Sequence, residues 1–565
     1  MYEASPRISR QAYGLNETFD YVIVGGGPSG LVVAEQLSRD PSVRVALLEA
    51  GPDASLDPLV YTPARFFQTG EYMWQYNSAP DPALNGIAPE LWQGRALGGG
   101  AAVNGMGYCR GSSSVFDEWA ELSGNDGLSW ESMFDAFKAT THFQEDVHPD
   151  DQTPVNTTSF GDGPLEITTQ RFQLGFDRPY VDKLSSALGL EEIDFCSGYG
   201  IGIAEQVDAI RADNRTRSYA WNTFGWLAVT RPNFEVHHDA WVSKIVFENK
   251  TAVGVTYTDT LTNTTLSLNA REVIVAAGAI GSPHLLMLSG VGPADQLEAV
   301  GVEVLHDSPD VGQNLMDHHY ARLVYETIPE MGTAWQWQNN ISISEEAEAQ
   351  YEATGDGLLG VPDGNVFGAL RLPDSVLNAD RPHFIYEYST APLQVSLANY
   401  STVTPFAALV QPEARGNVTL ASADYRIQPT INSAYWATPA DKAAMIYAYK
   451  DFRSLMTSPE LSPWLPVELF PGANVTSDED IWAAIQESSG SFHHPMGTVA
   501  IGTVLDEKWR VRGVDGLRVV GTPAAPRIIT CHTQATAYAM GYRAAMDIAA
   551  EDGLQIERED YNGMD

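Results

Sequence analysis

The chain of 565 residues has few cysteines and no long apolar run. Only Cys109, Cys196 and Cys531 occur, and no CxxC or Cys/His spacing indicates a zinc site or a redox dithiol, so no metal is expected. One disulfide bond is possible but a disulfide framework is not, so the cysteines do not assign a cellular compartment. No apolar run reaches the roughly 20 residues of a membrane-crossing helix, so we expect a soluble protein with no membrane partner.

Basic residues are also scarce. The chain has 33 Lys and Arg against 73 Asp and Glu, which gives a formal net charge of −40. Such a field repels phosphate backbones and anionic lipids, so nucleic acid is not an expected partner. A hydrophobic content of 44% with 49 glycines and 33 prolines is typical of a loop-rich globular enzyme. At this length we expect two or more domains.

Sequons for N-glycosylation are more frequent than chance predicts. Residue frequencies predict about three in a chain of this composition. A chance excess is the alternative to real N-glycans. The sequence begins with Met1 and a polar segment instead of a signal peptide. We expect a secreted mature protein whose leader is absent from this sequence. The nine sequons begin at Asn16, Asn156, Asn214, Asn249, Asn263, Asn340, Asn399, Asn417 and Asn474.

The strongest motif lies in residues 20–51, which predict a βαβ unit with a glycine-rich turn. Gly25 allows the tight turn, Gly27 lets a diphosphate approach the backbone, and Gly30 lets helix and strand pack closely. Glu49 ends the second strand and can accept hydrogen bonds from an adenosine ribose. The unit predicts dinucleotide binding at a helix N-terminus, with FAD and NAD both open. The predicted contacts are Gly25, Gly27, Pro28, Ser29, Gly30 and Glu49.

A second glycine-rich stretch covers residues 94–106 and carries almost no bulky side chains. A backbone this bare suits the close approach of a large flat ligand. A flexible surface linker is the alternative, but Leu97, Val103 and Met106 favour an ordered, buried loop. The predicted ligand contacts in this stretch are Arg95, Gly98, Gly99 and Asn104.

The remaining chain shows two kinds of pattern. Residues 273–278 and 517–520 predict further buried strands and residues 536–550 a helix, so the C-terminus is expected to complete the nucleotide-binding part. Between residues 317 and 482, longer polar loops and short strands predict an antiparallel sheet, with a helix at residues 441–456. This mixed region is the candidate substrate domain.

Two histidines near the C-terminus, His494 and His532, lie in loops of small residues. An imidazole titrates near neutral pH, which suits the removal of an alcohol proton. A second donor can hold the same oxygen and stabilise its negative charge. Two purely structural histidines are the alternative. Metal binding is disfavoured because no carboxylate or third histidine stands at ligand spacing.

Together these motifs resemble the glucose–methanol–choline (GMC) oxidoreductase family of flavoproteins, along nearly the whole chain. The resemblance implies FAD rather than NAD. It places His494 on the catalytic base and His532 on its partner, and it favours a structural role for His318. It also places the Val242 backbone at the adenine, and Thr533 and Gln534 beside the flavin ring. Beyond the first fingerprint, it rests on Gly94–Asn104, Gly278–Gly292 and Val311–His318.

The fold that the resemblance and the patterns predict is α/β. A Rossmann-like FAD-binding domain, discontinuous in sequence, is expected from residues 1–160, 205–316 and 484–565. A substrate-binding domain with an antiparallel sheet and helices is expected from residues 161–204 and 317–483.

The sequence departs from the family pattern in three places. Val103 stands where some members carry a histidine linked to the flavin, so FAD is expected to be non-covalent. Ala101 replaces a residue that is usually Gly, Ser or Thr. Gly521 stands where an Asp usually follows the strand, which weakens the carry-over of a diphosphate contact there.

The resulting hypothesis is an FAD-dependent oxidoreductase for primary or secondary alcohols, with oxygen or a quinone as acceptor. His494 takes the hydroxyl proton while hydride passes to flavin N5, and His532 holds the oxygen. The run His532-Thr533-Gln534 resembles the aryl-alcohol oxidase branch, with glucose oxidases and dehydrogenases next. An aryl or allylic alcohol is therefore the first expected substrate and a sugar the second. The alternative is a non-redox member, such as a hydroxynitrile lyase or a cyclase of secondary metabolism.

Overall fold

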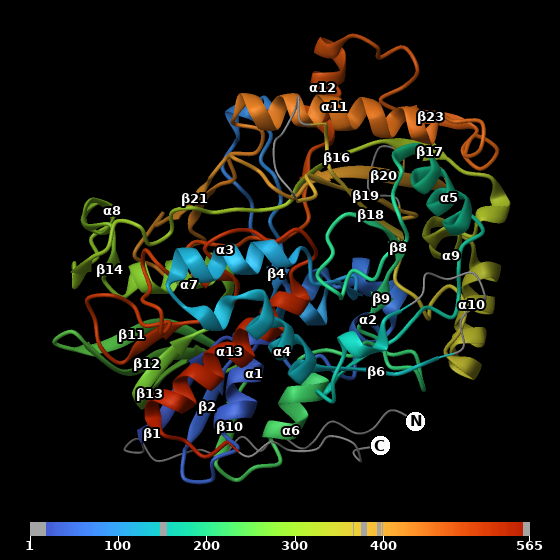
Figure 1. The fold of residues 1–565 in the computed structure, drawn as a ribbon. Coiled ribbons are helices and arrows are strands. Elements are labelled where there is room, and N and C mark those ends of the chain that lie inside the picture. Colours follow the sequence, from blue (N-terminus) through green and yellow to red (C-terminus); the bar gives the residue numbers. More distant parts are fainter. Residues whose placement is uncertain are drawn as a thin grey trace.

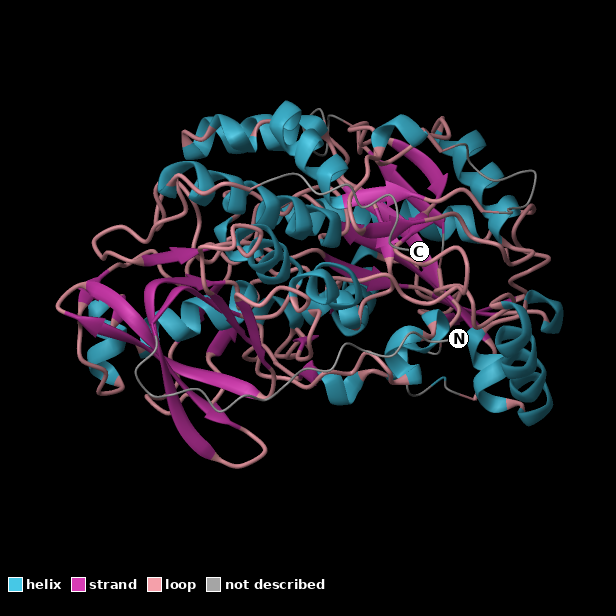
Figure 2. Ribbon diagram, turned by 90° about the horizontal axis from the view of Figure 1, so that it is seen from below, coloured by secondary structure: helices cyan, strands magenta, loops and turns pink. Residues whose placement is uncertain are grey.

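A computed structural model describes residues 18–146, 155–364, 366–373, 381–391, 397 and 399–556. Two large β-sheets organise this part of the chain, and Figure 2 shows them as two separate groups of strands. The architecture is the mixed α/β fold that the sequence predicts.

The first sheet has seven strands. β10, β2, β1 and β13 pair in parallel in that order, and β25 adds to β13, also in parallel. The long strand β13 also pairs antiparallel with β12, which pairs with β11. β2 and the second half of β1 are short runs of buried apolar residues, as strands covered on both faces require. The strands are β1 (Thr18–Val24), β2 (Val45–Leu48), β10 (Phe234–His237), β11 (Ala240–Glu248), β12 (Thr251–Asp259), β13 (Thr264–Val275) and β25 (Leu517–Val519).

The helix of the first βαβ unit, α1, belongs to a layer of three helices. α1 packs against the C-terminal helix α13, which also contacts α4, so the two ends of the chain lie side by side (Figure 1). Gly541 of α13 permits this contact, because a Cβ there would lie 2.7 Å from the Ser29 carbonyl oxygen. The predicted βα character of the C-terminus is confirmed. The helices are α1 (Pro28–Leu37), α4 (Trp130–Thr140) and α13 (Gln534–Asp552).

The second sheet has eight strands and is antiparallel. Its last strand, β24, pairs with β16 and lies beyond residue 483, the predicted end of the substrate domain. The strands are β8 (Gly202–Glu205), β16 (His319–Arg322), β17 (Val324–Glu326), β18 (Val366–Leu370), β19 (Phe384–Ser389), β20 (Thr402–Leu409), β23 (Val467–Phe470) and β24 (Gly490–Ser491). The helices packed on it are α5 (Asp177–Leu188), α11 (Pro439–Met456) and α12 (Asp478–Ser488).

The two faces of the second sheet differ because successive strand residues point to opposite sides. On β19, Phe384, Tyr386 and Tyr388 share a core with residues of α5 and α11. Ile385 lies on the other face, in a small cluster that contains Cys531. Glu387 lies on that face as well and contacts His532. This face therefore meets the C-terminal segment that carries the predicted histidines.

The remaining elements are short or peripheral. Residues 52–93 contain only brief helical turns and two-residue strands. Within the described residues, no helix is both long and apolar enough to cross a bilayer. These elements are α2 (Pro58–Tyr61), α3 (Ser113–Ser123), α6 (Trp226–Ala228), α7 (Gly278–Leu288), α8 (Ala294–Ala299), α9 (Ala334–Asn339), α10 (Ile341–Thr354), β3 (Met73–Trp74), β4 (Gln93–Gly94), β5 (Gly107–Tyr108), β6 (Thr141–Phe143), β7 (Leu165–Ile167), β9 (Val207–Asp208), β14 (Val291–Gly292), β15 (His306–Asp307), β21 (Asn417–Thr419) and β22 (Thr430–Asn432).

Candidate active site

The predicted glycine fingerprint forms the turn between β1 and α1. Gly25 has a φ of +111°, and a Cβ there would lie 2.5 Å from the Ala276 carbonyl oxygen. A Cβ at Gly30 would lie 2.0 Å from the Gly25 carbonyl oxygen. The close helix–strand packing expected of this unit is therefore present. Pro28 occupies the first helical turn of α1, where its missing N–H leaves no donor unsatisfied.

Glu49 lies at the end of β2 and is held by backbone amides. Its carboxylate accepts from the Gly26 N–H at 2.8 Å and from the Gly51 N–H at 2.9 Å. Burial raises the pKa of Glu49 to about 7, against the lowering effect of these amides and of Arg95. The amides fix the carboxylate at the carboxyl end of the parallel strands, where ribose hydroxyls are bound in folds of this kind.

The second glycine-rich stretch packs directly on the first. Gly99 has a φ of +54°, and a Cβ there would lie 2.6 Å from the Cα of Gly27. A Cβ at Gly98 would lie 2.5 Å from the ring of Tyr219. The alternative of a flexible linker is wrong, because the residues from Ala101 to Val103 are buried within the main core.

A buried arginine holds this second stretch in place. Arg217 donates to the carbonyl of Ala101 at 3.1 Å and to the carbonyl and side-chain oxygens of Asn104, both at 2.7 Å. Burial lowers the pKa of Arg217 to about 10. The sequence analysis missed Arg217, because a single arginine in a loop carries no spacing signal.

The two glycine-rich segments fit the diphosphate end of a dinucleotide. Gly27 and Gly99 pack backbone to backbone with no side chain on either. The absence of side chains is what lets a diphosphate approach the α1 N-terminus closely. Around them, three buried polar atoms have no hydrogen-bond partner among the described residues. They are Arg95 Nε, Arg217 Nη2 and the Tyr219 hydroxyl.

Other predicted cofactor contacts lie at the margins of this cradle. Val242 stands in β11 beside a register irregularity between Val242 and Lys244. Ser29 is buried and donates to the Ala537 carbonyl at 2.6 Å. Gly521, which replaces the usual Asp, packs on Ser29 with a φ of +85°, and a Cβ there would lie 2.6 Å from the serine hydroxyl. The backbone at position 521 therefore fits glycine.

The predicted histidines lie together at the other end of the site. His494 follows β24, His532 precedes α13, and their ring centroids are 5.1 Å apart. The Nε2 atom of His494 lies 3.4 Å from the Nδ1 atom of His532. The structure thus brings together two residues that are 38 positions apart in sequence.

Glu387 of β19 completes this pair. Its Oε1 atom lies 2.8 Å from Nε2 of His532. Burial alone lowers the pKa of His532, but the charge and hydrogen bond of Glu387 outweigh that effect and raise it. The sequence analysis missed Glu387. The available signal was a single acid within an otherwise apolar strand, since a buried charge needs a partner.

His494 has the opposite electrostatics. Burial lowers its pKa well below the ordinary value, and the neighbouring His318, His532 and His493 add to this effect. Its own backbone N–H donates to Asp317 at 2.9 Å. Two histidines with pKa values shifted in opposite directions suit an acid–base pair, because the neutral form is favoured at His494 and the protonated form at His532.

An aromatic cluster surrounds the two histidines; it consists of Tyr320, Phe367, Phe406 and Phe492. The centroid of Phe492 lies 5.7 Å from both imidazoles, and Phe367 lies 5.8 Å from His532. Tyr320 and Phe406 pack on Phe492 at 5.1 and 5.2 Å. The surface beside the histidines is therefore mainly apolar.

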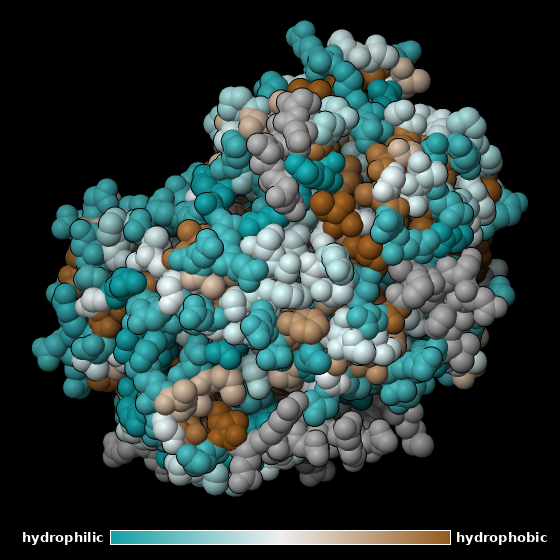
Figure 3. Space-filling model, viewed as in Figure 1, coloured by the Kyte–Doolittle hydropathy of each residue, from teal (hydrophilic) through white to brown (hydrophobic). Residues whose placement is uncertain are grey.

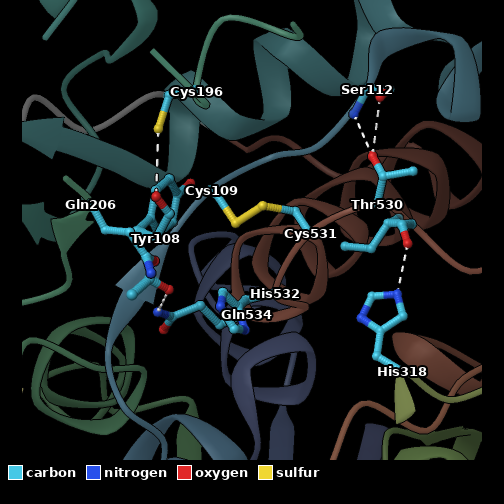
Figure 4. The surroundings of a disulfide bond; sticks show 12 residues. Tyr108, Cys109, Ser112, Cys196, Gln206, His318, Thr530, Cys531, His532 and Gln534 are labelled. Atoms are coloured by element: carbon cyan, nitrogen blue, oxygen red, sulfur yellow. Dashed lines mark hydrogen bonds between the residues drawn. A yellow bond between two sulfur atoms is a disulfide. The ribbon is translucent and has the colours of Figure 1, made fainter. Parts of the chain in front are cut away.

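A disulfide bond lies next to His532. Cys109 and Cys531 are joined across 422 residues, while Cys196 is free and buried (Figure 4). The side-chain amide of Gln534 donates to the carbonyls of Met106 and Gly107, both at 2.6 Å. Gln534 and the disulfide therefore connect the segment after residue 105 to the start of α13. Thr533 stands at the N-cap of that helix.

Within the described residues, no group of three or more His, Cys, Asp or Glu is arranged to hold a metal ion. The two histidines, Glu387 and the aromatic cluster instead form a proton-handling site without a metal-ligand geometry.

Comparison with known proteins places the chain in a family. The two sequence profiles described as GMC oxidoreductase match residues 19–320 and 412–541. An oxygen-dependent choline dehydrogenase from Xanthomonas euvesicatoria pv. vesicatoria is 31% identical, over 97% of this chain and 98% of the relative. An FAD-dependent oxidoreductase structure from Chaetomium thermophilum has a TM-score of 0.86 at 27% identity, covering 95% of this chain and 100% of that one. A fungal aryl-alcohol oxidase has a TM-score of 0.83 at 26% identity, covering 95% and 100%. The chain belongs to the GMC oxidoreductase family and depends on FAD, as its motifs and its cradle of glycines predict.

Proposed function

We propose that this protein oxidises an aryl or allylic primary alcohol. The family acts on alcohol-type substrates, and the aromatic cluster is the observation that supports this particular class. Phe492 lies at equal ring distance from both histidines, so a flat ring stacked on it holds its carbinol carbon near them. Stacked or edge-to-face aromatic pairs gain about 0.5–1.5 kcal/mol beyond the area they bury.

The two histidines divide the work. His494, kept neutral by burial, accepts the hydroxyl proton on its ring nitrogen. His532, whose pKa Glu387 raises, donates in its protonated form to the same oxygen and stabilises the negative charge that develops there. FAD, when bound, supplies the two-electron acceptor for the hydride. The protein's own contribution is to orient the alcohol and move its proton.

A sugar or a quaternary ammonium alcohol fits these surroundings less well. A sugar needs several polar partners, and the aromatic cluster offers one hydroxyl, that of Tyr320. A cation beside Phe492 would lie near the protonated His532, because Glu387 already pairs with that imidazole. The name of the bacterial choline relatives therefore does not transfer to this chain.

We propose oxygen or a quinone as the electron acceptor. The similar proteins include oxygen-dependent choline dehydrogenases and an aryl-alcohol oxidase, which supports this choice. Measuring turnover with each alcohol in air and with a quinone under argon distinguishes an oxidase from a dehydrogenase. Peroxide formation equal to aldehyde formation identifies the oxidase.

We also propose that the protein is secreted and N-glycosylated. The disulfide bond supports an oxidising compartment. Among the sequon asparagines, Asn156, Asn249, Asn263, Asn340, Asn399 and Asn474 are exposed, Asn214 and Asn417 are half-buried, and Asn16 lies outside the described residues. Expression in a secreting eukaryotic host followed by glycosidase digestion tests this. An unchanged mass after digestion would count against the glycans.

The decisive test of the activity is anaerobic addition of alcohols to the yellow holoenzyme. We expect benzylic and allylic alcohols to bleach the flavin absorbance faster than glucose or choline at equal concentration. No bleaching with any alcohol would reject the redox function and favour a non-redox reaction.

A further inference from the structure

His318 is a third histidine in direct contact with the pair, and its surroundings fix where its proton lies. It is fully buried. Its Nε2 atom lies 2.8 Å from the backbone carbonyl oxygen of Ile529. A carbonyl oxygen only accepts, so Nε2 of His318 must carry the hydrogen. Burial lowers the pKa of His318 to about 3, against the raising effect of the Ile529 and Val410 carbonyls, so the ring is neutral; with its one hydrogen on Nε2, its Nδ1 atom is an acceptor.

The bare Nδ1 atom of His318 faces His494. The two Nδ1 atoms are 3.0 Å apart, a hydrogen-bond distance that needs one hydrogen between them. Since His318 supplies none, the hydrogen is on Nδ1 of His494. A neutral imidazole carries only one N–H, so Nε2 of His494 is unprotonated. That atom is the one that faces His532.

We propose that His318 is a positioning residue that selects the tautomer of His494 and so presents its Nε2 atom as the base. This inference rests on the proposed function, because it concerns the same alcohol deprotonation. In the opposite tautomer, two bare Nδ1 atoms would face each other at 3.0 Å. Nε2 would then carry a hydrogen and could not accept a proton from the substrate.

The short segment from residue 529 to residue 532 contacts both ends of the row of three imidazoles, His318, His494 and His532. Ile529 bonds His318 at one end, and His532 lies at the other, three residues later. Between them, the Thr530 hydroxyl accepts from the Ser112 N–H at 2.8 Å, and Cys531 is bonded to Cys109 (Figure 4). The disulfide and the Thr530 hydrogen bond thus anchor this segment, and through it they position His318 and His532 relative to each other.

Two conservative substitutions separate this role from a purely structural one. In His318→Asn, the side-chain oxygen stands near the position of Nδ1 and can still accept from His494, but Ile529 loses its donor. In His318→Gln, the longer amide stands near the position of Nε2 and can still donate to Ile529, but His494 loses its acceptor. Each of the two variants therefore removes one of the two His318 contacts and keeps the other.

We expect kcat to follow the His494 contact. His318→Asn should retain kcat within about threefold, whereas His318→Gln should lose about 10- to 100-fold, by analogy with residues that orient metal-bound histidines through their second ring nitrogen. KM should change less than kcat, and FAD content should match the wild type in both. Thermal stability should show the reverse order, because only Gln keeps the Ile529 contact. Wild-type kcat in His318→Gln, or an equal loss in both variants, would overturn the proposal.

A second measurement is independent of turnover. Selective 15N labelling of histidine distinguishes a protonated ring nitrogen from a bare one by its chemical shift, and His494→Ala identifies the His494 signals. We expect a bare Nε2 in the wild type and in His318→Asn, and a protonated or mixed Nε2 in His318→Gln. A protonated Nε2 in the wild type would overturn the proposal even if the alcohol activity is confirmed. If no alcohol reduces the flavin, the proposed function is rejected, but the 15N measurement still decides independently whether His318 selects the His494 tautomer.

Discussion

Replacing Glu387 with glutamine tests the division of roles between the two histidines. The substitution Glu387→Gln keeps the size of the side chain and an oxygen that accepts from Nε2 of His532. It removes only the negative charge, which lies 2.8 Å from that nitrogen. Glu387 is 4% exposed, so solvent screens this charge very little.

The expected loss in the rate of flavin reduction follows from the change in the type of hydrogen bond to His532. A hydrogen bond between charged groups contributes about 1.5–3 kcal/mol and one between neutral groups about 0.5–1.5 kcal/mol. The difference of about 1–2 kcal/mol corresponds to a factor of roughly 5–30 in rate, if the charge on His532 stabilises the transition state. We therefore expect the rate of flavin reduction at neutral pH to fall about 5- to 30-fold.

The pH dependence shows in which pH range the variant should be slower than the wild type. The pKa of His532 is raised above 6.5, so its protonated form is present at low pH and is lost as the pH rises through that raised value. Without the charge of Glu387, burial lowers the pKa of His532, so the variant loses the protonated form at a lower pH. The two enzymes should differ little in acid and most between the two pKa values. Burial lowers the pKa of His494 well below 6.5, so the expected difference between the two enzymes at neutral pH comes from His532.

The assay is anaerobic stopped-flow reduction of the flavin by a benzylic alcohol between pH 5 and 9. Glu468→Gln is the matched control, because Glu468 lies in the same sheet but pairs with Arg453 at 2.7 Å. We expect the control to keep the wild-type pH profile. Identical pH profiles for Glu387→Gln and the wild type would refute the assignment of His532 as the charged partner.

Three further predictions test other parts of the site. Gly99→Ala should abolish retention of FAD, read from the absorbance ratio at 450 and 280 nm, because its Cβ would lie 2.6 Å from Gly27; Gly100→Ala, where a Cβ meets nothing within 4 Å, should keep the cofactor. Replacing both Cys109 and Cys531 with serine should lower the free energy of unfolding by about 2–4 kcal/mol in denaturant titrations, whereas Cys196→Ser, which touches no disulfide, should leave the disulfide contribution intact. Phe492→Ala should raise KM for benzyl alcohol more than for a short aliphatic alcohol; an equal rise for both would contradict stacking on that ring.

The cofactor cradle could be predicted because its elements are close in sequence. The turn from β1 to α1 places Gly25, Gly27 and Gly30 within six residues, and Glu49 follows at the end of the next strand. Local geometry alone requires these residue types, so the pattern is visible without the fold. The predicted helices at residues 441–456 and 536–550 begin two residues earlier in the structure, at Pro439 and Gln534, which shows the usual limit of such predictions, the position of element ends.

The reaction centre could be predicted only in part, because its contacts join distant segments. His494 and His532 were identifiable by residue type, but Glu387 lies 145 residues before His532 and meets it only through the pairing of β19 in the second sheet. The partner of Cys109 was equally invisible, since 422 residues separate the two cysteines. Long-range pairing of this kind leaves no periodic signal in the sequence.

The arrangement separates what the enzyme must keep from what it can vary. His318, His494, His532 and Glu387 are linked in sequence by hydrogen bonds, so a change at one of them acts on the protonation of its direct partner. Phe492 and Phe367 contact the histidine rings without hydrogen-bonding to them, and Tyr320 and Phe406 pack on Phe492. Substitution in that cluster can therefore change which alcohol fits while the base and its charged partner keep their states. Substrate choice in this chain should therefore follow the aromatic side chains of the second sheet and of the loop before His494, and the chemical step should follow the hydrogen-bonded set of His318, His494, His532 and Glu387.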